Sequence, residues 1–317
     1  MEKPFLPVIT GPTASGKTAC AVEFCLLANG EVVSADSMQV YRGMEILSAT
    51  PTKSEMRGVP HHMLGVFSPN ERCTAAEYRD RANRAIAEIL QRSKQPLLCG
   101  GTGLYIDAVT RPMRFSEKSD ETMHAELLAL ADEPGGRTRL HEMLEKIDPE
   151  SAARLHENDV RRVARAIEIY RLTGKTQTEQ SREDAQREGD YCETIFALEW
   201  NREALYERIS RRVDEMLERG LINEVRALVR ENGDSPTAVQ AIGYKEIAAA
   251  LEGRTSINQA IADVKRATRN YAKRQMTWLR RDARTIWIPA EGRSASEIAK
   301  EIYEKWRIIA EQNAPAK

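Results

Sequence analysis

The chain has 317 residues, about two domains' worth, of which 41% are hydrophobic and 30% charged. This composition is typical of a globular protein with a sizeable core; it excludes intrinsic disorder, and no apolar run reaches the ~18 residues of a membrane span. With 47 basic and 48 acidic residues the net charge is −1, so a nucleic-acid site has to be a local patch.

Short apolar runs predict buried strands, and amphipathic patterns between them predict helices. The expected strands are Phe5–Thr10, Glu31–Ser34, Pro96–Cys99, Thr194–Glu199 and Thr285–Ile288, and the expected helices are Lys17–Ala28, Thr74–Arg92, Arg202–Leu217 and Ile257–Arg281. This alternation indicates an α/β fold whose mostly parallel sheet is flanked by helices. The strand signal disappears between about residues 114 and 190. We therefore predict a core of residues 1–113 plus 191–317 and an all-helical insertion domain of residues 114–190.

The strongest motif, G-x4-G-K-[ST], lies between the first strand and the first helix and predicts a P-loop NTPase-like core. Its residues are Gly11, Pro12, Thr13, Ala14, Ser15, Gly16, Lys17 and Thr18. Glycines let backbone N–H groups surround phosphate oxygens, and the helix N-terminus adds the positive end of its dipole. Lys17 would supply a charge to the terminal phosphate, and Thr18 a hydroxyl ligand for Mg²⁺. The motif predicts a phosphate or diphosphate site but leaves open which group is transferred.

Polar residues also follow two neighbouring strands, at the sheet edge where ligands bind in open α/β folds. Asp36 follows the second strand, where a carboxylate could accept a proton or ligate a metal through water. A simple turn aspartate is the alternative. The next strand ends in Gly100–Gly103, whose glycines permit close backbone approach to a ligand and whose Thr102 offers a hydroxyl. A plain tight turn is the alternative here.

Arg212 borders an apolar stripe on the helix Arg202–Leu217. The stripe consists of Leu205, Ile209, Val213 and Met216. A guanidinium at the rim of a buried face could meet a phosphate, and snorkelling at the edge of the core is the alternative.

Two helices carry basic faces. In the insertion, Arg161, Arg162 and Arg165 lie opposite the apolar stripe of Asp159–Leu172, and a solvated face is the alternative because the insertion is acidic overall. The stretch Lys265–Arg284 holds eight basic residues and one acidic residue. One side of its helix carries Lys265, Arg266, Arg269, Lys273 and Arg280, and the other carries Ile261, Val264, Tyr271 and Trp278. This pattern predicts nucleic-acid contact on the basic side.

Histidines and cysteines point to no metal site. His61 and His62 have no partner at metal spacing, so we expect buried, hydrogen-bonded side chains. Five scattered cysteines without a CxxC pair favour neither a disulfide framework nor a zinc module. The N-terminal segment does not have the layout of a signal peptide, and we expect a cytoplasmic protein.

Taken together, these motifs resemble those of the tRNA dimethylallyltransferases, also called tRNA isopentenyltransferases. The resemblance covers nearly the whole chain and rests, in family order, on GPTASGKT (Gly11–Thr18), DSMQVYR (Asp36–Arg42), PHH (Pro60–His62), LLCGGTGLY (Leu97–Tyr105), NDVRRVARAIEIY (Asn158–Tyr170), RRVDEMLERGLINEVRAL (Arg211–Leu228), QAIGYKE (Gln240–Glu246) and KRQMTWLR (Lys273–Arg280).

The resemblance implies transfer of a dimethylallyl group from dimethylallyl diphosphate to N6 of the adenosine just 3′ of a tRNA anticodon. It implies that residues 11–18 hold the diphosphate with Mg²⁺, that Asp36 takes the N6 proton, and that Thr102 positions the reacting groups. Lys17 and Arg212 would neutralise the leaving diphosphate. The implied contacts with the tRNA anticodon stem-loop are Asp36, Ser37, Met38, Gln39, Thr102, Gly103, Arg161, Arg162, Val163, Ala164, Arg165, Gln240, Gly243, Lys245, Lys273, Arg274, Trp278 and Arg280. We expect a monomer that does not bind membranes.

The sequence departs from the family pattern at one point and leaves two other functions open. Thr50 stands where the family usually has a lysine, which removes one basic group near the acceptor. No Cys/His finger follows the core, unlike in the longer eukaryotic type. The first alternative function is a P-loop kinase for a small molecule or nucleoside, with ATP as donor. The second is an RNA-binding NTPase that works as a switch.

Overall fold

The computed structural model describes residues 3–115, 120–232, 235 and 237–313. The chain divides into two compact units. The first, here called the core unit, consists of residues 1–110 and 191–317, and the second, the helical unit, consists of residues 111–190. Within the described ranges, no helix is both long and apolar enough to cross a membrane.

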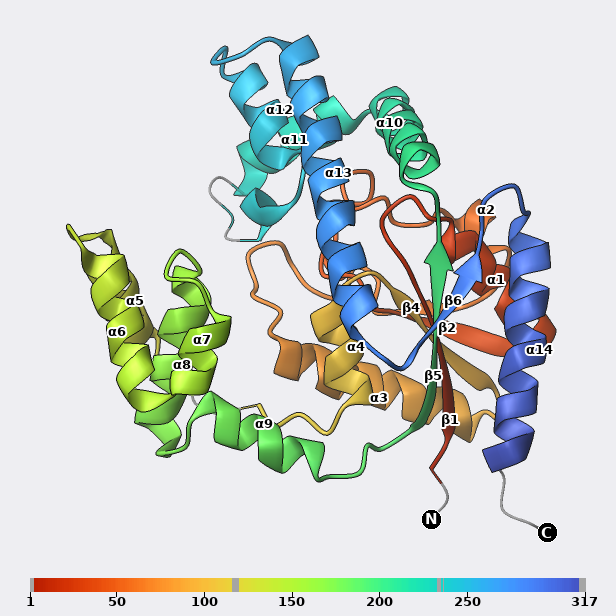
Figure 1. Cartoon of the computed structure of the whole chain (residues 1–317). Helices are drawn as coiled ribbons and strands as arrows, with labels where there is room; N and C mark the ends of the chain where they lie inside the picture. The colour runs from red at the N-terminus through yellow and green to blue at the C-terminus, as the bar shows by residue number, and fades with distance from the viewer. Residues whose placement is uncertain (1–2, 116–119, 233–234, 236, 314–317) are drawn as a thin grey trace. The chain divides into compact units, whose positions relative to one another are not determined.

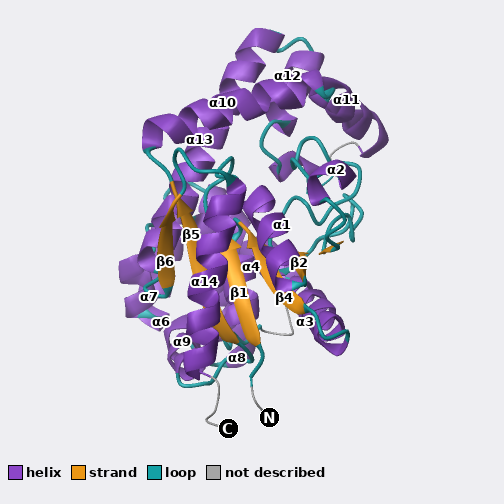
Figure 2. Cartoon of the chain, turned by 90° about the vertical axis from the view of Figure 1, so that its right-hand side faces the viewer, coloured by secondary structure: helices purple, strands orange, loops and turns teal. Residues whose placement is uncertain are grey.

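The core unit holds a parallel sheet that, among the residues described, has six strands in the order β3-β2-β4-β1-β5-β6 (Figure 2). They are β1 (Phe5–Thr10), β2 (Gly30–Ser34), β3 (His61–His62), β4 (Gln95–Gly100), β5 (Cys192–Glu199) and β6 (Thr285–Pro289). The predicted fold class is confirmed. The sequence analysis missed β3, because a strand of two residues has no periodicity to detect.

Helices cover both faces of this sheet, as a parallel sheet requires. They are α1 (Lys17–Ala28), α3 (Ala75–Gln91), α4 (Gly103–Thr110) and α14 (Ala295–Asn313), while the short α2 (Lys53–Met56) precedes β3. Alternate strand side chains point to opposite faces. Leu6 and Leu98 pack in a core that includes residues of α3 and α4, whereas Ile9 and Cys99 pack with α1 and α14. Figure 1 shows α1 with α14 on one side of the sheet and α3 with α4 on the other.

The helices that follow β5 stand over the carboxyl ends of the strands (Figures 1 and 2). They are α10 (Arg202–Glu218), α11 (Leu221–Asn232), α12 (Tyr244–Leu251) and α13 (Ile257–Arg281), with the 3-10 helix Ala238–Gln240 before α12. The long helix α13 descends from this layer and reaches α4. Its inner face therefore borders the sheet edge where ligands bind in open α/β folds.

The helical unit has its own apolar core. Its helices are α5 (Glu121–Asp132), α6 (Gly136–Ile147), α7 (Pro149–Arg154), α8 (Val160–Thr173) and α9 (Gln177–Ala185). Leu140, Leu144 and Ile167 are almost completely buried in this core. Val163 and Ala164 lie there too, with 1% and 0% exposure. Their side chains therefore lie inside the helical unit, because α8 turns them away from its exposed arginine face, and their contact with tRNA stays a prediction.

Candidate active site

The phosphate loop, residues 11–18, is held from outside by the segment after β5. Trp200 Nε1 donates to the carbonyl of Ser15 at 2.9 Å, and Arg208 Nε donates to the carbonyl of Ala14 at 2.8 Å. The Arg208 guanidinium also lies over the Trp200 ring, 4.3 Å from its centroid. These contacts fix the backbone of the loop, which lowers the ordering cost of binding a ligand.

Buried polar groups around this loop call for an anion. Lys17 Nζ donates to the Pro12 carbonyl at 3.1 Å, and burial lowers the pKa of Lys17. Burial also lowers the pKa of Arg212, whose Nη2 donates to the Ala49 carbonyl at 3.3 Å. Ser15 Oγ is buried and finds no hydrogen-bond partner in the described part of the chain. Because buried cations and unpaired hydroxyls cost free energy, a bound diphosphate would stabilise all three groups.

A cavity of about 300 Å³ opens between this loop and the helices above the sheet. It brings together ten of the predicted site residues, namely Thr13, Lys17, Thr18, Asp36, Ser37, Met38, Gln39, Arg212, Gln240 and Arg274. Leu47, Ile209, Val213 and Val264 supply apolar wall. A cavity with a cationic floor and an apolar wall suits a ligand that has an anionic end and a hydrocarbon end.

Asp36 and Thr102 join the loops that follow β2 and β4. Asp36 Oδ1 accepts from the backbone N–H of Met38 at 2.9 Å and of Gln39 at 3.4 Å. The turn interpretation therefore holds for Oδ1, and within the described residues the hydrogen bonds of this carboxylate use that oxygen. Thr102 Oγ1 accepts from the Ser37 N–H at 2.9 Å. The second carboxylate oxygen of Asp36 is thus positioned by the turn while remaining a possible proton acceptor.

A half-buried carboxylate that the sequence analysis missed holds the segment before α2. Glu224 of α11 accepts from the backbone N–H groups of Ile46 at 2.8 Å and Leu47 at 2.7 Å. Burial raises the pKa of Glu224. The Ala49 carbonyl of the same segment accepts from Arg212 and, also at 3.3 Å, from Gln39 Nε2. Glu224 therefore supports the orientation of two predicted site residues without touching the cavity.

Thr50, which replaces the usual family lysine, lies on a second cavity of about 550 Å³ beside the phosphate loop. The two cavities share Lys17, Thr18 and Arg212. The lining of the second one holds four arginines, with Arg208, Arg211 and Arg219 joining Arg212, and three glutamates, Glu55, Glu215 and Glu218. The Thr50 hydroxyl lies 2.8 Å from Ser48 Oγ. Positive charge is therefore supplied near this position by α10 and the residue that follows it.

Tyr271 and Gln275 of α13 are among the residues that line the first cavity. The sequence analysis placed Tyr271 on the buried face, but this side chain is only partly buried and faces the cavity. Burial, together with the negative charge of Asp36, raises the pKa of Tyr271 to about 12. Gln275 was not singled out at all. The available signal was a polar residue on the face that also buries Ala272 and Leu279.

The basic face of α13 is smaller than predicted, because several of its cations have partners inside the core unit. Lys265 pairs with Asp214 at 2.6 Å, Arg266 pairs with Asp263 at 2.8 Å, and Arg269 donates to Ser210 Oγ. Lys273, Arg274 and Arg280 are exposed. Exposed cations are therefore concentrated in the carboxyl-terminal half of the helix, while Arg266 in the first half is also exposed despite its pair with Asp263.

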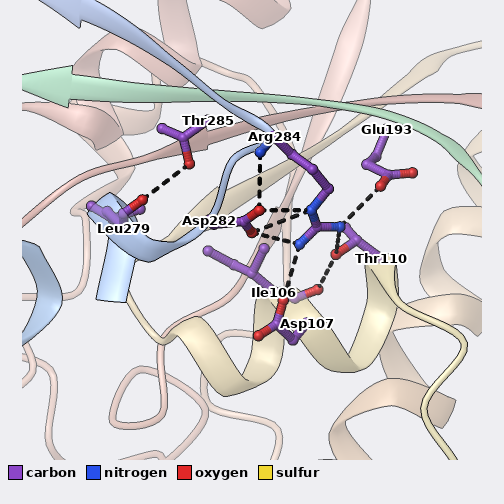
Figure 3. A network of polar contacts seen from close by, with 8 residues as sticks. All are labelled: Ile106, Asp107, Thr110, Glu193, Leu279, Asp282, Arg284 and Thr285. Carbon is purple, nitrogen blue, oxygen red and sulfur yellow. Dashed lines mark hydrogen bonds and ion pairs between the residues drawn. The ribbon is translucent and has the colours of Figure 1, made fainter. Parts of the chain in front are cut away.

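Arg284 is a further correction to that basic face, since its guanidinium is bound internally (Figure 3). It contacts Asp282 at 2.6 Å, Glu193 at 2.9 Å and Asp107 at 3.0 Å, and it donates to Thr110 Oγ1 at 3.2 Å. Three carboxylates surround one cation, so the pKa of Arg284 is raised, although burial alone would lower it. The Arg284 side chain links the start of β6 to α4 and β5, so its guanidinium is not available to bind a phosphate.

Seven predicted tRNA-contact residues of the core unit lie outside the lining of the first cavity, namely Thr102, Gly103, Gly243, Lys245, Lys273, Trp278 and Arg280. Gly103 packs against the Trp278 ring. Gly243 is buried at the N-terminus of α12 with φ +102°, which explains the glycine by backbone conformation. The side chain of Lys245 is exposed. Thr102 accepts the hydrogen bond described above from Ser37, which does line the cavity.

The remaining predicted contacts belong to the helical unit. Arg161 and Arg162 are exposed on α8, and Arg162 pairs with Asp159 at 3.1 Å. Arg165 is half-buried and pairs with the buried Glu168 at 2.9 Å. Two of the three arginines on this face thus pair with a carboxylate, and the carboxylate that pairs with Arg165 is buried.

The two histidines are hydrogen-bonded as predicted but only half-buried. His61 Nδ1 lies 2.9 Å from the Val59 carbonyl, and His62 Nε2 lies 2.7 Å from a carboxylate oxygen of Glu31. Burial lowers the pKa of His61. His61 also lines the first cavity, and its Nε2 has no hydrogen-bond partner among the described residues.

Known proteins share this sequence and fold. The model of the IPP transferase family matches residues 39–282. The tRNA dimethylallyltransferase of Halalkalibacterium halodurans is 46% identical over 284 residues, covering 89% of this chain and 90% of the relative. That of Carboxydothermus hydrogenoformans is 42% identical over 297 residues, covering 94% of this chain and 96% of the relative.

Solved structures agree. The full-length tRNA isopentenylpyrophosphate transferase from Bacillus halodurans has a TM-score of 0.71 and 42% identity, covering 98% of this chain and 97% of that one. A eukaryotic dimethylallyltransferase acting on tRNA has a TM-score of 0.83 and 27% identity, covering 99% of this chain and 81% of that one. Because the family model matches more than half of the chain and these relatives cover most of it, this chain belongs to the IPP transferase family.

Proposed function

We propose that this protein is a tRNA dimethylallyltransferase that transfers a dimethylallyl group from dimethylallyl diphosphate to N6 of the adenosine just 3′ of the anticodon. The observation that carries the proposal is the arrangement of one cavity. Buried Lys17 and Arg212 face it together with the carboxylate Asp36, and part of its wall is apolar. The cations suit the diphosphate, the wall suits the prenyl group, and the carboxylate suits the nucleophile.

Each group has a defined task in the reaction. The N6 lone pair attacks C1 of the prenyl group, the C1–O bond breaks, and diphosphate leaves with its electron pair. An adenine amino group is a weak nucleophile, so Asp36 accepts the N6 proton as the C–N bond forms. Lys17 and Arg212 stabilise the charge that develops on the leaving diphosphate. The adenosine has to leave its stack to reach the cavity, which a flexible anticodon loop makes inexpensive.

Mg²⁺ is part of the proposal. The described residues contain no cluster of three or more His, Cys, Asp or Glu that could hold a metal ion by themselves. The oxygen donors present, the Thr18 hydroxyl with Asp36 on the same cavity, fit an ion that completes its shell with diphosphate oxygens and water. When bound, Mg²⁺ would add positive charge at the leaving group.

The kinase and switch functions fit less well. The relatives found are named as dimethylallyltransferases or isopentenylpyrophosphate transferases acting on tRNA, not as kinases. The exposed cations Lys273 and Arg280 of α13 would also be unnecessary for a small acceptor. The tRNA contacts listed from the sequence, the monomeric state and the cytoplasmic location remain predictions.

One assay tests the proposal. Protein, Mg²⁺ and unmodified tRNA are mixed with dimethylallyl diphosphate in one arm and with ATP in the other. We expect mass spectrometry to detect one isopentenyl addition on a single adenosine in the first arm. In the second arm we expect neither phosphoryl transfer nor hydrolysis. Turnover of ATP without prenyl transfer would favour the kinase or the switch.

A further inference from the structure

Gln275, on the inner face of α13, bridges two loops of the active site. Its side chain is 7% exposed, and both ends of its amide are used. Oε1 accepts from the backbone N–H of Thr13 at 2.8 Å, and Nε2 donates to the carbonyl of Gly101 at 2.8 Å. The first partner belongs to the phosphate loop after β1, and the second belongs to the turn after β4. One side chain therefore bridges two loops that leave the adjacent strands β1 and β4, whose last paired residues are Thr10 and Gly100.

The glycines of the β4 turn make room for α13. A Cβ atom added to Gly101 would lie 2.3 Å from Gln275 Nε2, and one added to Gly103 would lie 2.3 Å from the Trp278 ring. Such contacts would force the side chains of Gln275 and Trp278 to move. The sequence analysis explained these glycines by close approach to a ligand or by a tight turn. In the structure, Gly101 and Gly103 admit two side chains spaced one helical turn apart.

This contact reaches the reacting groups through Thr102, which lies between the two glycines. Thr102 Oγ1 accepts from Ser37 N–H at 2.9 Å, and Ser37 follows the expected base Asp36. Gln275 thus connects the loop that would hold the diphosphate with the loop that carries the base. An error of about 1 Å between donor and acceptor can cost about 10²-fold in rate. The separation set by this amide therefore matters for transfer more than for folding.

We infer that Gln275 is a positioning residue for prenyl transfer, whose amide holds the phosphate loop and the Thr102 turn at the separation the reaction needs. The inference rests on the proposed function. It assigns Gln275 no contact with the reacting atoms. It also predicts that losing either hydrogen bond lowers kcat while the affinity for tRNA is retained.

The first variant is Gln275→Met, which keeps the length of the side chain and removes both hydrogen bonds. We expect kcat to fall about 10- to 100-fold with the Kd for tRNA within about twofold of the wild type. Gln259→Met is the matched control, because this exposed glutamine of the same helix bonds only to Asp263 and Ser256 in the described part of the chain. An unchanged kcat in Gln275→Met overturns the inference. So does a loss confined to tRNA binding.

The second variant, Gln275→Glu, separates positioning from packing. An ionised carboxylate at position 275 is repelled by the carbonyl oxygen of Gly101. A protonated carboxyl restores both hydrogen bonds, because its O–H donates to the Gly101 carbonyl and its other oxygen accepts from the Thr13 N–H. Activity relative to the wild type at the same pH should therefore rise as the pH falls from about 8 to about 5.5. A constant ratio overturns the inference. This variant also decides the question if Gln275→Met fails to fold.

Binding of inorganic diphosphate distinguishes a failure of this inference from a failure of the proposed function. A wild type that binds diphosphate and tRNA but transfers no prenyl group contradicts the proposed function, and the positioning role falls with it. A wild type that transfers, with a Gln275→Met variant equal to it in kcat and in diphosphate affinity, contradicts only the positioning role. We expect diphosphate to bind Gln275→Met more weakly, since the phosphate loop loses the bond at Thr13.

Discussion

At the scale of single residues, Asp36 combines a structural and a chemical role. One of its oxygens closes the turn to Met38 and Gln39, which fixes the orientation of the carboxylate. The cavity also holds Arg212, whose pKa the negative charge of Asp36 shifts upward against the larger effect of burial. A residue that is a turn aspartate by geometry can therefore still serve as the base of the proposed reaction.

Asp36→Asn separates these two roles. The amide oxygen of Asn can still accept from the Met38 N–H, so the turn should survive, but an amide cannot take the N6 proton. We expect single-turnover transfer to slow by about 10²- to 10⁴-fold. Affinity for tRNA should stay near that of the wild type. Asp36→Ala, which also removes the turn bond, should be worse in both measurements. Wild-type turnover in Asp36→Asn would exclude this residue as the base.

At the scale of elements, the edge of the sheet depends on a buried charge cluster. Glu31 of β2 is 3% exposed and meets Arg92 at 2.7 Å, Lys94 at 3.3 Å and, from the short strand β3, His62. Burial by itself raises the pKa of Glu31, but these hydrogen bonds outweigh it and lower the pKa to about 2. The cluster strengthens the attachment of β3 to the sheet, because β3 pairs with β2 through two residue pairs.

Removing this charge should have a pH signature. A lowered carboxyl pKa stabilises the fold above the unfolded pKa of about 4.3, and the stabilisation is lost as the pH falls toward 2. We expect Glu31→Gln to lower the free energy of unfolding by about 2–3 kcal/mol at pH 7, with a smaller difference below about pH 4. Urea titrations across this range measure it. The exposed Glu304→Gln is the control, and a pH-independent difference would contradict the assignment.

The helix α13 presents different chemistry on its two sides. Tyr271 and Gln275 face the cavity, while Lys273 and Arg280 are exposed. Residues two positions apart on a helix point in very different directions, so a single element can line the site and also bind a polyphosphate. This division makes a separate test of the outer face possible.

Lys273→Ala should weaken tRNA binding and flatten its dependence on salt. Each phosphate contact adds roughly 0.9 to the slope of log K against log salt concentration, so the slope should fall by about 1. Lys300→Ala on α14 is the control, because this lysine is equally exposed on another element. Equal slopes for Lys273→Ala and the wild type would mean that the outer face of α13 is only solvated.

At the scale of the whole molecule, each unit carries its own basic surface. The core unit has the carboxyl-terminal half of α13, and the helical unit has Arg161 and Arg162 on α8. The residues around the phosphate loop all belong to the core unit, so the proposed binding of diphosphate should need that unit alone. The two units should therefore contribute separably to substrate affinity.

Arg161→Ala tests the helical unit. Loss of one exposed guanidinium should raise KM for tRNA several-fold, on the order of 1 kcal/mol, because one phosphate contact is lost. Both kcat and the affinity for diphosphate should stay unchanged. Arg171→Ala, an exposed arginine near the other end of α8, serves as the comparison. If the two variants are indistinguishable in steady-state kinetics, the predicted contact at Arg161 is wrong.

Local patterns in the sequence predicted the frame of the molecule well. The motif at residues 11–18 and the bounds of α13 were correct, because both follow from short-range spacing. Gln275 could not be found in this way, since its partners Thr13 and Gly101 are 262 and 174 positions away. Arg284 was counted only as one of eight basic residues in the stretch Lys265–Arg284, because its partners Asp107 and Glu193 are also distant in the sequence. Only tertiary contacts reveal that three carboxylates surround it.

The contacts that hold the phosphate loop have a consequence for synthesis on the ribosome. Trp200 and Arg208, whose side chains hydrogen-bond to the phosphate loop, lie 185 and 194 positions after their partners in it. Gln275 comes later still. A nascent chain therefore displays the complete GPTASGKT motif long before the groups that shape it have been translated. Capture of the prenyl donor should begin only once most of the polypeptide has emerged, so prematurely terminated products would not compete for it.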